Sequence, residues 1–183
     1  MSSRRLSSFK PVVDRRSRVL ILGTMPGPEA LRRREYYGYP LNHFWKILPQ
    51  IFDKGPLDGY REKIRFLRKK RIALWDVIGS CKREGAADQK IQEVKTNDIS
   101  DLLRRYPNIR KVFLNGRLAQ KLYQKYFGKS LRVPACYLPS TSPANAGLGF
   151  EKKTERWRVV AVSLRSGIYS RNRRSSVQQP LLR

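Results

Sequence analysis

The residues best suited to chemistry in this chain are amides, hydroxyls, glycines and one carboxylate in four short segments. The segments are residues 23–28, Asp76, Asn115 with Gly116, and residues 139–146. Each directly follows a short apolar run. Such side chains hydrogen-bond to phosphate oxygens and to the edges of nucleobases, and glycine lets the backbone come close to a ligand. The segments therefore predict a site for a flat or phosphorylated ligand.

The first segment is a loop that leaves a buried apolar run. Two Pro and two Gly within residues 23–28 exclude regular structure there. The segment is not a P-loop, because the Gly-Lys-Ser/Thr ending is absent. An ordinary strand–helix connection is the alternative to a ligand-binding loop. The residues expected to contact a base are Gly23, Thr24, Met25, Pro26 and Gly27.

An aromatic cluster at residues 36–45 offers a stacking surface. Tyr37 is the candidate for stacking on a base, because its ring can stack while its hydroxyl still hydrogen-bonds. Phe44 and Trp45 have the spacing of a buried helix face. Asn42 precedes them and could simply cap that helix, which requires no chemistry.

Asn115 and Asp76 each follow a predicted strand. The amide of Asn115 offers a donor and an acceptor, so it could contact a base edge, or it could begin a turn with Gly116. Asp76 could cap a helix or pair with one of the many Arg side chains.

The most distinctive segment follows Leu138. Three adjacent hydroxyls between two prolines predict a rigid loop rich in donors, which suits phosphate contacts, and its small apolar residues could enter a duplex. A polar surface loop is the alternative. The residues expected to contact DNA are Ser140, Thr141, Ser142, Pro143, Ala144 and Asn145.

Apolar runs and helical spacing predict alternating strands and helices. Strands are expected at residues 18–22, 72–75, 111–114 and 132–138, helices at 42–52, 60–70, 98–103, 118–127 and 151–164, and an irregular stretch at 79–95. This order predicts an α/β fold with a parallel sheet covered by helices on both faces. Ligands on such sheets bind at the carboxyl ends of the strands, so the four segments should meet in one cleft.

The chain is strongly basic. Its 183 residues include 40 Lys and Arg against 14 Asp and Glu, a formal net charge of +26. This excess favours a polyanionic partner, above all nucleic acid. Residues 1–17 are expected to form a flexible basic arm and residues 166–183 a disordered basic tail. Both should raise affinity without setting specificity.

Composition also argues against several classes of protein. No apolar run approaches the roughly 20 residues of a membrane span, and the N-terminus lacks the apolar region of a secretory signal. Cys81 and Cys136 are expected to stay reduced, and His43 is the single histidine, so zinc sites of the all-Cys or multi-His type are not expected. We expect no metal, no cofactor and a cytoplasmic protein, associated with the nucleoid if the source is a prokaryote.

Together these residues resemble the uracil-DNA glycosylase superfamily. Residues 23–27 are similar to the Gly-x-Asn-Pro-Gly loop of the mismatch-specific and thymine-DNA glycosylases, and residues 42–45 to the Asn-x-Phe-Trp that follows it. Residues 138–140 look like the superfamily's His-Pro-Ser or Asn-Pro-Ser loop. The resemblance implies a three-layer αβα sandwich around a four-stranded, mainly parallel sheet, with the glycosylase domain at residues 18–165.

Two departures favour the hypoxanthine-DNA glycosylase branch. Met25 stands where the mismatch-specific enzymes have a water-activating Asn, and Leu138 where the uracil enzymes have a His. In that branch, which removes deaminated adenine from DNA, the Asn matching Asn42 is implicated in catalysis.

The resemblance thus implies a monomeric, monofunctional DNA glycosylase of base excision repair. It would flip a deaminated base, hypoxanthine or else uracil or xanthine, out of DNA and hydrolyse its bond to deoxyribose. Asn42 would orient water or contact the leaving base. The backbone N–H groups of residues 24–27 and the amide of Asn115 would stabilise the charge on that base.

Two other functions stay open from the sequence. A nonenzymatic nucleic-acid-binding protein would explain the charge but not the four segments. A metal-dependent nuclease would use Asp76 and Asp88 as metal ligands.

Overall fold

A four-stranded sheet forms the centre of the computed structural model, which describes residues 5–83, 91–128 and 130–172. The strands lie in the order β3-β2-β6-β7 and all run parallel. Every residue of β2 is buried, because a parallel strand between two helical layers is covered on both faces. The strands are β2 (Val19–Gly23), β3 (Ile72–Asp76), β6 (Lys111–Asn115) and β7 (Ala135–Leu138).

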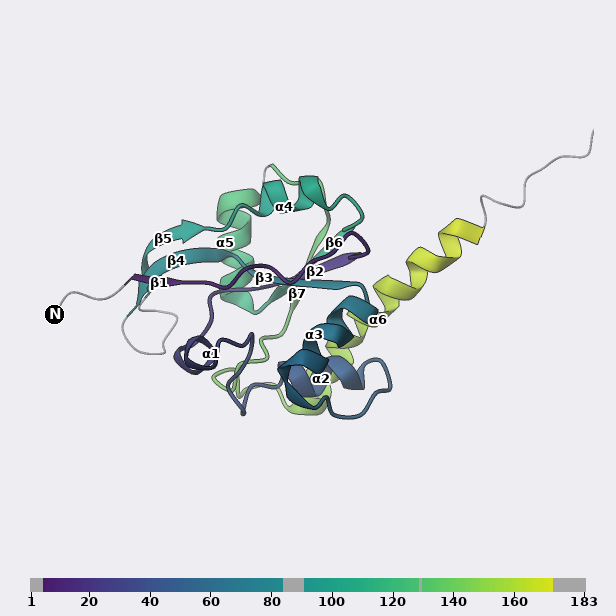
Figure 1. Cartoon of the computed structure of the whole chain (residues 1–183), viewed down its shortest axis with the longest axis horizontal. Helices are drawn as coiled ribbons and strands as arrows, with labels where there is room; N and C mark the ends of the chain where they lie inside the picture. Colours follow the sequence, from purple (N-terminus) through teal and green to yellow (C-terminus); the bar gives the residue numbers. More distant parts are fainter. Residues whose placement is uncertain (1–4, 84–90, 129, 173–183) are drawn as a thin grey trace, which may run out of the picture.

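Helices cover both faces of this sheet (Figure 1). Neighbouring residues of β2 contribute to different cores: Ile21 packs with α2, α3 and α6, whereas Leu22 packs with α4 and α5. This arrangement confirms the predicted α/β class and the three-layer sandwich. The helices are α2 (Phe44–Gln50), α3 (Gly59–Lys69), α4 (Ile99–Arg105), α5 (Arg117–Phe127) and α6 (Phe150–Asn172).

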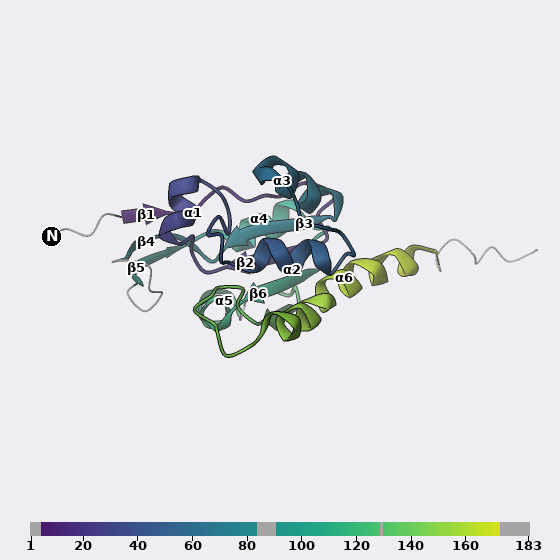
Figure 2. The same ribbon diagram turned by 90° about the horizontal axis from the view of Figure 1, so that it is seen from below.

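A second, antiparallel sheet lies at one end of the molecule, and α6 projects from the other (Figures 1 and 2). This second sheet contains β1 (Arg5–Ser7), β4 (Ile78–Arg83) and β5 (Ile91–Thr96) in the order β1-β4-β5. The expectations of an irregular stretch at 79–95 and a flexible arm at 1–17 are therefore wrong for the residues in these strands. The strands are short and polar, so pairing between distant segments rather than a local apolar run stabilises them.

The expected domain boundaries also change. Beyond β1, Val12 pairs with Leu74 of β3, so the N-terminal segment belongs to the folded domain. Helix α6 continues past Leu164 to Asn172, into the expected tail, while residues 173–183 lie outside the described residues. A short helix that was not predicted, α1 (Pro28–Arg33), follows the loop after β2. Within the described ranges, no helix combines the length and apolar character needed to cross a membrane.

The carboxyl ends of the four parallel strands lie along one edge of the sheet. Gly23 is paired with Asp76 in the ladder between β2 and β3, and Asn115 with Leu138 between β6 and β7. The four polar segments of the sequence begin at or directly after these residues. Their expected convergence at the carboxyl edge is confirmed.

Gly23 leaves no room for a side chain. A Cβ atom there would collide with a carboxylate oxygen of Asp76 and lie 2.9 Å from the hydroxyl oxygen of Tyr37. We expect Gly23→Ala to lower the free energy of unfolding by about 1–3 kcal/mol, the usual cost of an extra carbon in a packed site. Urea unfolding measures this change.

Gly27→Ala is the matched control, because a Cβ at Gly27 meets nothing within 4 Å. Its cost should stay below about 1 kcal/mol, the scale of a helix-start substitution. Equal stabilities of the two variants would show that Asp76 and Tyr37 do not constrain Gly23.

Candidate active site

A cavity of about 430 Å³ opens at the carboxyl edge of the sheet. Its volume falls in the range of small-molecule sites, about 300–1,000 Å³. Asn42 and all seven expected base-binding residues line it, as does the expected DNA-binding loop from Ser140 to Ala144, whereas Asn145 does not. Pro28 and Asp76, which the sequence analysis placed in the same cleft, line the cavity too. The further lining residues are Glu29, Ala30, Tyr36 and Tyr39.

Asn115 organises the back wall of this cavity. Its Nδ2 donates to the hydroxyl of Tyr37 and to Oγ1 of Thr141, both at 3.0 Å, and its Oδ1 accepts from the Thr141 N–H at 3.0 Å. Both amide hydrogens are therefore engaged within the protein. Instead of offering its NH₂ group to a base, as expected from the sequence, Asn115 holds Tyr37 and Thr141 in place.

The turn after Asn115 brings the fourth segment close. Gly116 has a φ of 101°, a conformation that a side chain disfavours, and α5 begins directly after it. A Cβ at Gly116 would lie 3.1 Å from the Cβ of Ser140. The glycine thus lets the β6–α5 turn and the loop after β7 pack together.

Tyr37 lines the cavity, and its ring is held from one side. That face stacks on Phe44, with ring centroids 3.9 Å apart and planes 14° from parallel. Burial, and then the charge of Asp76, raise the pKa of the Tyr37 hydroxyl, so it stays protonated at neutral pH. The ring is fixed from behind and could stack on a base from the cavity side.

Asn42 both caps a helix and faces the cavity. Its Oδ1 accepts the N–H of Phe44, the first residue of α2, at 3.0 Å, although His43 is the N-cap residue itself. Its Nδ2 has no hydrogen-bond partner among the residues that the structure describes. The N–H of His43 donates to the carbonyl of Thr141 at 3.0 Å. The amide is therefore held rigidly with one donor group available for a ligand.

His43 does not take part in the cavity lining. Its ring meets the ring of Phe150 edge-on, with centroids 5.3 Å apart. Burial, and then the charges of Lys153 and Lys46, lower the pKa of the imidazole. The side chain is therefore mainly neutral at pH 7 and adds little positive charge near Asn42.

Asp76 supplies a carboxylate to the cavity wall. It is only 3% exposed, and its Oδ2 accepts a hydrogen bond from the hydroxyl of Ser8 at 2.9 Å. The second ligand of the nuclease hypothesis, Asp88, lies outside the described residues. Among the residues described, no three His, Cys, Asp or Glu side chains form a group that could hold a metal.

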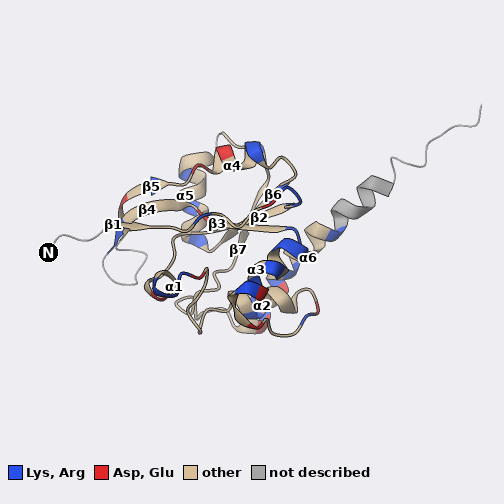
Figure 3. Cartoon of the chain, viewed as in Figure 1, with Lys and Arg blue, Asp and Glu red and all other residues tan. Residues whose placement is uncertain are grey.

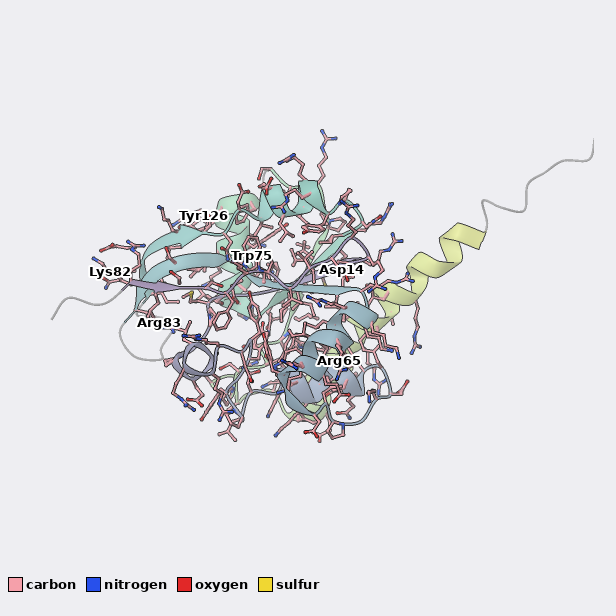
Figure 4. The ribbon with its side chains drawn as sticks, in the orientation of Figure 1. Asp14, Arg65, Trp75, Lys82, Arg83 and Tyr126 are labelled. Atoms are coloured by element: carbon pink, nitrogen blue, oxygen red, sulfur yellow. The ribbon has the colours of Figure 1, made fainter. Side chains whose placement is uncertain are left out.

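The loop after β2 is held from behind by the second sheet. The buried guanidinium of Arg83, labelled between that sheet and α1 in Figure 4, donates to the carbonyl of Pro26 at 2.8 Å. The side chain of Met25 packs with Ile78 and Cys81. Met25 therefore anchors the loop and, as a thioether, cannot activate water in place of the missing Asn.

Backbone donors remain available in the same loop. Residues 24, 25 and 27 have N–H groups that find no hydrogen-bond acceptor within the described part of the chain. The other two residues of this loop, Pro26 and Pro28, have no backbone N–H. Fixed N–H groups of this kind can stabilise a developing negative charge.

The loop after β7 is tied together by its own hydroxyls. The Oγ of Ser140 accepts the N–H of Ser142 at 3.2 Å, and the Oγ of Ser142 accepts the N–H of Ala144 at 3.3 Å. Neither hydroxyl donates to an acceptor among the residues that the structure describes, so both O–H hydrogens can donate to a ligand. Asn145 instead supports the loop, since its Nδ2 donates to the carbonyl of Ser140 at 3.2 Å.

Helix α6 fixes this loop to the core. Trp157 is fully buried and its Nε1 donates to the carbonyl of Pro139 at 2.9 Å. Lys153 is 1% exposed, and its Nζ donates to the carbonyl of Asn145 at 2.7 Å. Burial lowers the pKa of this lysine. Neither contact had a local pattern in the sequence, because each joins residues of different elements.

Comparisons with known proteins agree with this geometry. The family model of the uracil DNA glycosylase superfamily matches residues 10–163. A protein of Methanosarcina acetivorans named hypoxanthine DNA glycosylase is 35% identical over 153 residues, which cover 83% of this chain and 95% of that protein. One of the same name from Methanosarcina barkeri is 38% identical over 110 residues, or 60% of this chain and 70% of that protein.

A solved structure is similar as well. The solution NMR structure of a protein from Methanosarcina acetivorans, assigned as a uracil DNA glycosylase, has a TM-score of 0.73 and 31% identity to this chain. The similarity covers 86% of this chain and 99% of that one. With the family match over residues 10–163, it shows that the chain belongs to the uracil DNA glycosylase superfamily, a family of DNA glycosylases.

Proposed function

We propose that this DNA glycosylase removes hypoxanthine, the deamination product of adenine, from DNA. One observation carries the proposal: a single cavity presents the ring of Tyr37, the carboxylate of Asp76 and the amide of Asn42. A base turned out of the duplex would meet a stacking surface, an acceptor and a donor together. The names of the two Methanosarcina relatives support the choice of base.

The carboxylate of Asp76 suits the edge of hypoxanthine. An ionised carboxylate only accepts hydrogen bonds, and hypoxanthine carries an N1–H that adenine lacks. Adenine presents the lone pair of N1 instead, which a carboxylate repels. Uracil and xanthine also carry ring N–H groups, so this contact does not separate them from hypoxanthine. The names of the two relatives are the reason for placing hypoxanthine first.

Asn42 is the proposed catalytic residue. Water adds to C1′ of the deoxyribose while the bond to the base breaks, and the base leaves with the electron pair and gains a proton, so that an abasic site remains. A neutral amide is a weak base, but a dissociative reaction depends mainly on positioning and electrostatics. Asn42 would orient the water or contact the leaving base, with the N–H groups of residues 24, 25 and 27 stabilising its charge.

The rim of the cavity suits a DNA duplex. Lys and Arg side chains are spread over the molecule, on α1 beside the cavity as well as on α3, α4 and α6 (Figure 3), in keeping with the net charge of +26. Ser140 and Ser142 would donate to phosphates. Tyr39 and Leu41, 42% and 57% exposed, offer apolar contacts to the bases beside the extruded one. Ala144 would lie nearest the gap that this base leaves.

Asn42→Ala should slow excision of hypoxanthine by roughly 100-fold or more, because it removes a positioned reacting group. Asn42→Ser separates this role from the helix cap, since a hydroxyl can accept the N–H of Phe44 but offers no amide. We expect both variants to be slow and Asn42→Ser to remain as stable as the wild type. Single-turnover rates on a duplex with one deoxyinosine, followed by alkaline cleavage of abasic sites, measure the effect.

Asn108→Ala is the matched control. Its amide donates to the carbonyl of Arg15 and does not line the cavity, so the rate should not change. If Asn42→Ser excises hypoxanthine within a few-fold of the wild-type rate, Asn42 is a helix cap only and the catalytic assignment is wrong.

Replacing Ser140 and Ser142 together by Ala should weaken binding to a lesion-containing duplex between a few-fold and about a hundredfold, at roughly 0.5–1.5 kcal/mol for each hydroxyl.

Ala144→Gly should slow excision from duplex DNA more than from single strands, because only a duplex can restack. Binding by fluorescence anisotropy and single-turnover rates on both substrates test this. Unchanged binding and rates would remove the loop from the DNA interface.

A further inference from the structure

Helix α6 holds the loop after β7 at both of its ends. At the start of the loop, the indole Nε1 of Trp157 donates to the carbonyl of Pro139 at 2.9 Å. At the end of the loop, Nζ of Lys153 donates to the carbonyl of Asn145 at 2.7 Å. Both donor side chains are buried, and one helical turn separates them on the inner face of α6. The helix therefore holds the loop at two points.

The connection between the loop and the helix gives little support of its own. Residues 146–149 read Ala-Gly-Leu-Gly and lead into the start of α6 (Figure 2). A Cβ atom at Gly147 would meet nothing within 4 Å, so no neighbour packs closely on the backbone there. Within the described residues, Lys153 makes the only hydrogen bond that joins residues 140–148 to this helix. Without it, the end of the loop would lose its hydrogen bond to α6.

A lysine is a costly residue at this position. Its side chain is almost completely buried, and no Asp or Glu in the described part of the chain pairs with it. Burial of an unpaired ammonium group is unfavourable, whereas a methionine of similar length would fill the same space without this penalty. A charged donor also makes a stronger hydrogen bond than a neutral one. The bond from Lys153 is therefore suited to resisting a force on the loop.

The end of the loop that Lys153 holds is the end that would enter a DNA duplex. Ala144, next to Asn145, is the residue proposed to lie nearest the gap left by the extruded base. The bases beside the gap tend to restack and close it, so a wedge works only if its backbone keeps its place. Asn115 holds the first half of the loop through Thr141, and hydrogen bonds within the loop set its shape. The bond from Lys153 opposes displacement of the second half.

We propose that Lys153 is a positioning residue that braces the wedge of this loop against restacking of the duplex. The inference rests on the proposed function and deepens it, because it assigns the opening of duplex DNA, as distinct from single strands, to a contact outside the cavity. Loss of this hydrogen bond lets the end of the loop give way, so that a base is extruded from a duplex less often. The groups that line the cavity stay in place, since Lys153 is not among them.

The experiment uses the full chain as wild type, as Lys153→Met, as Ala144→Gly and with both changes together. Lys152→Met is the matched control, because it removes an exposed charge one position earlier on the same helix. Single-turnover excision of hypoxanthine is measured against enzyme concentration on a duplex with one deoxyinosine and on the same strand alone. This gives a maximal rate for each substrate, and urea unfolding shows whether each variant is folded.

We expect Lys153→Met to lower the maximal rate on the duplex roughly tenfold, the scale of one hydrogen bond from a charged donor. The rate on the single strand should change by less than about twofold, because no restacking opposes extrusion there. The double variant should be no slower on the duplex than the slower single variant, since both changes act on one loop. Lys152→Met should keep the wild-type ratio of the two rates.

Three results would overturn the inference: a wild-type duplex rate for Lys153→Met, equal losses on the duplex and the single strand, or losses that add up in the double variant. If Lys153→Met does not fold, Lys153→Gln takes its place with the same expected result, because its side chain ends one atom short of the Asn145 carbonyl. A wild type that releases no hypoxanthine from either substrate would overturn the proposed function and this inference with it. An active wild type whose ratio of rates survives Lys153→Met would overturn the inference alone.

Discussion

The cavity depends on the three hydrogen bonds of one buried amide, that of Asn115. They join Tyr37, from the N-terminal half of the chain, to Thr141, from the loop after β7. Asn42 is coupled to the same group, because the N–H of the adjacent His43 donates to the carbonyl of Thr141. The stacking ring, the hydroxyl-rich loop and the proposed catalytic amide therefore keep their mutual positions without regular structure between them.

Buried donors from outside the central sheet support the two loops of the site. Arg83 of the second sheet holds the carbonyl of Pro26, and Trp157 of α6 holds the carbonyl of Pro139. The backbone carbonyls of a loop are not paired with a neighbouring strand and need other partners. Side-chain donors such as Arg83 and Trp157 therefore determine the shape of these loops. The N-terminal segment adds a third support through Ser8 and Asp76. The reacting groups thus face a cavity whose walls are fixed from behind.

The central sheet and most of the cavity lining were predictable because their causes are local. Apolar runs such as residues 19–22 indicate strands buried on both faces, and the polar segments at their ends must meet when the strands are parallel. The second sheet was not predictable, since β1 and β4 have few apolar residues and are stabilised by pairing across the chain and by the small cluster of Met25, Ile78 and Cys81. For the same reason the sequence did not show that the amide of Asn115 bonds within the protein, because its partners Tyr37 and Thr141 lie 78 and 26 positions away.

The central claim is that this cavity holds an extruded deaminated base while its bond to the sugar is hydrolysed. The most direct measurement is the mass of the products after the full chain meets a duplex with one deoxyinosine, without alkaline treatment. The account predicts free hypoxanthine and an intact strand that carries one abasic site. A cut strand or a released deoxyinosine nucleotide would indicate a nuclease, and unchanged DNA that is nevertheless bound would indicate a nonenzymatic binding protein; either result would contradict the account.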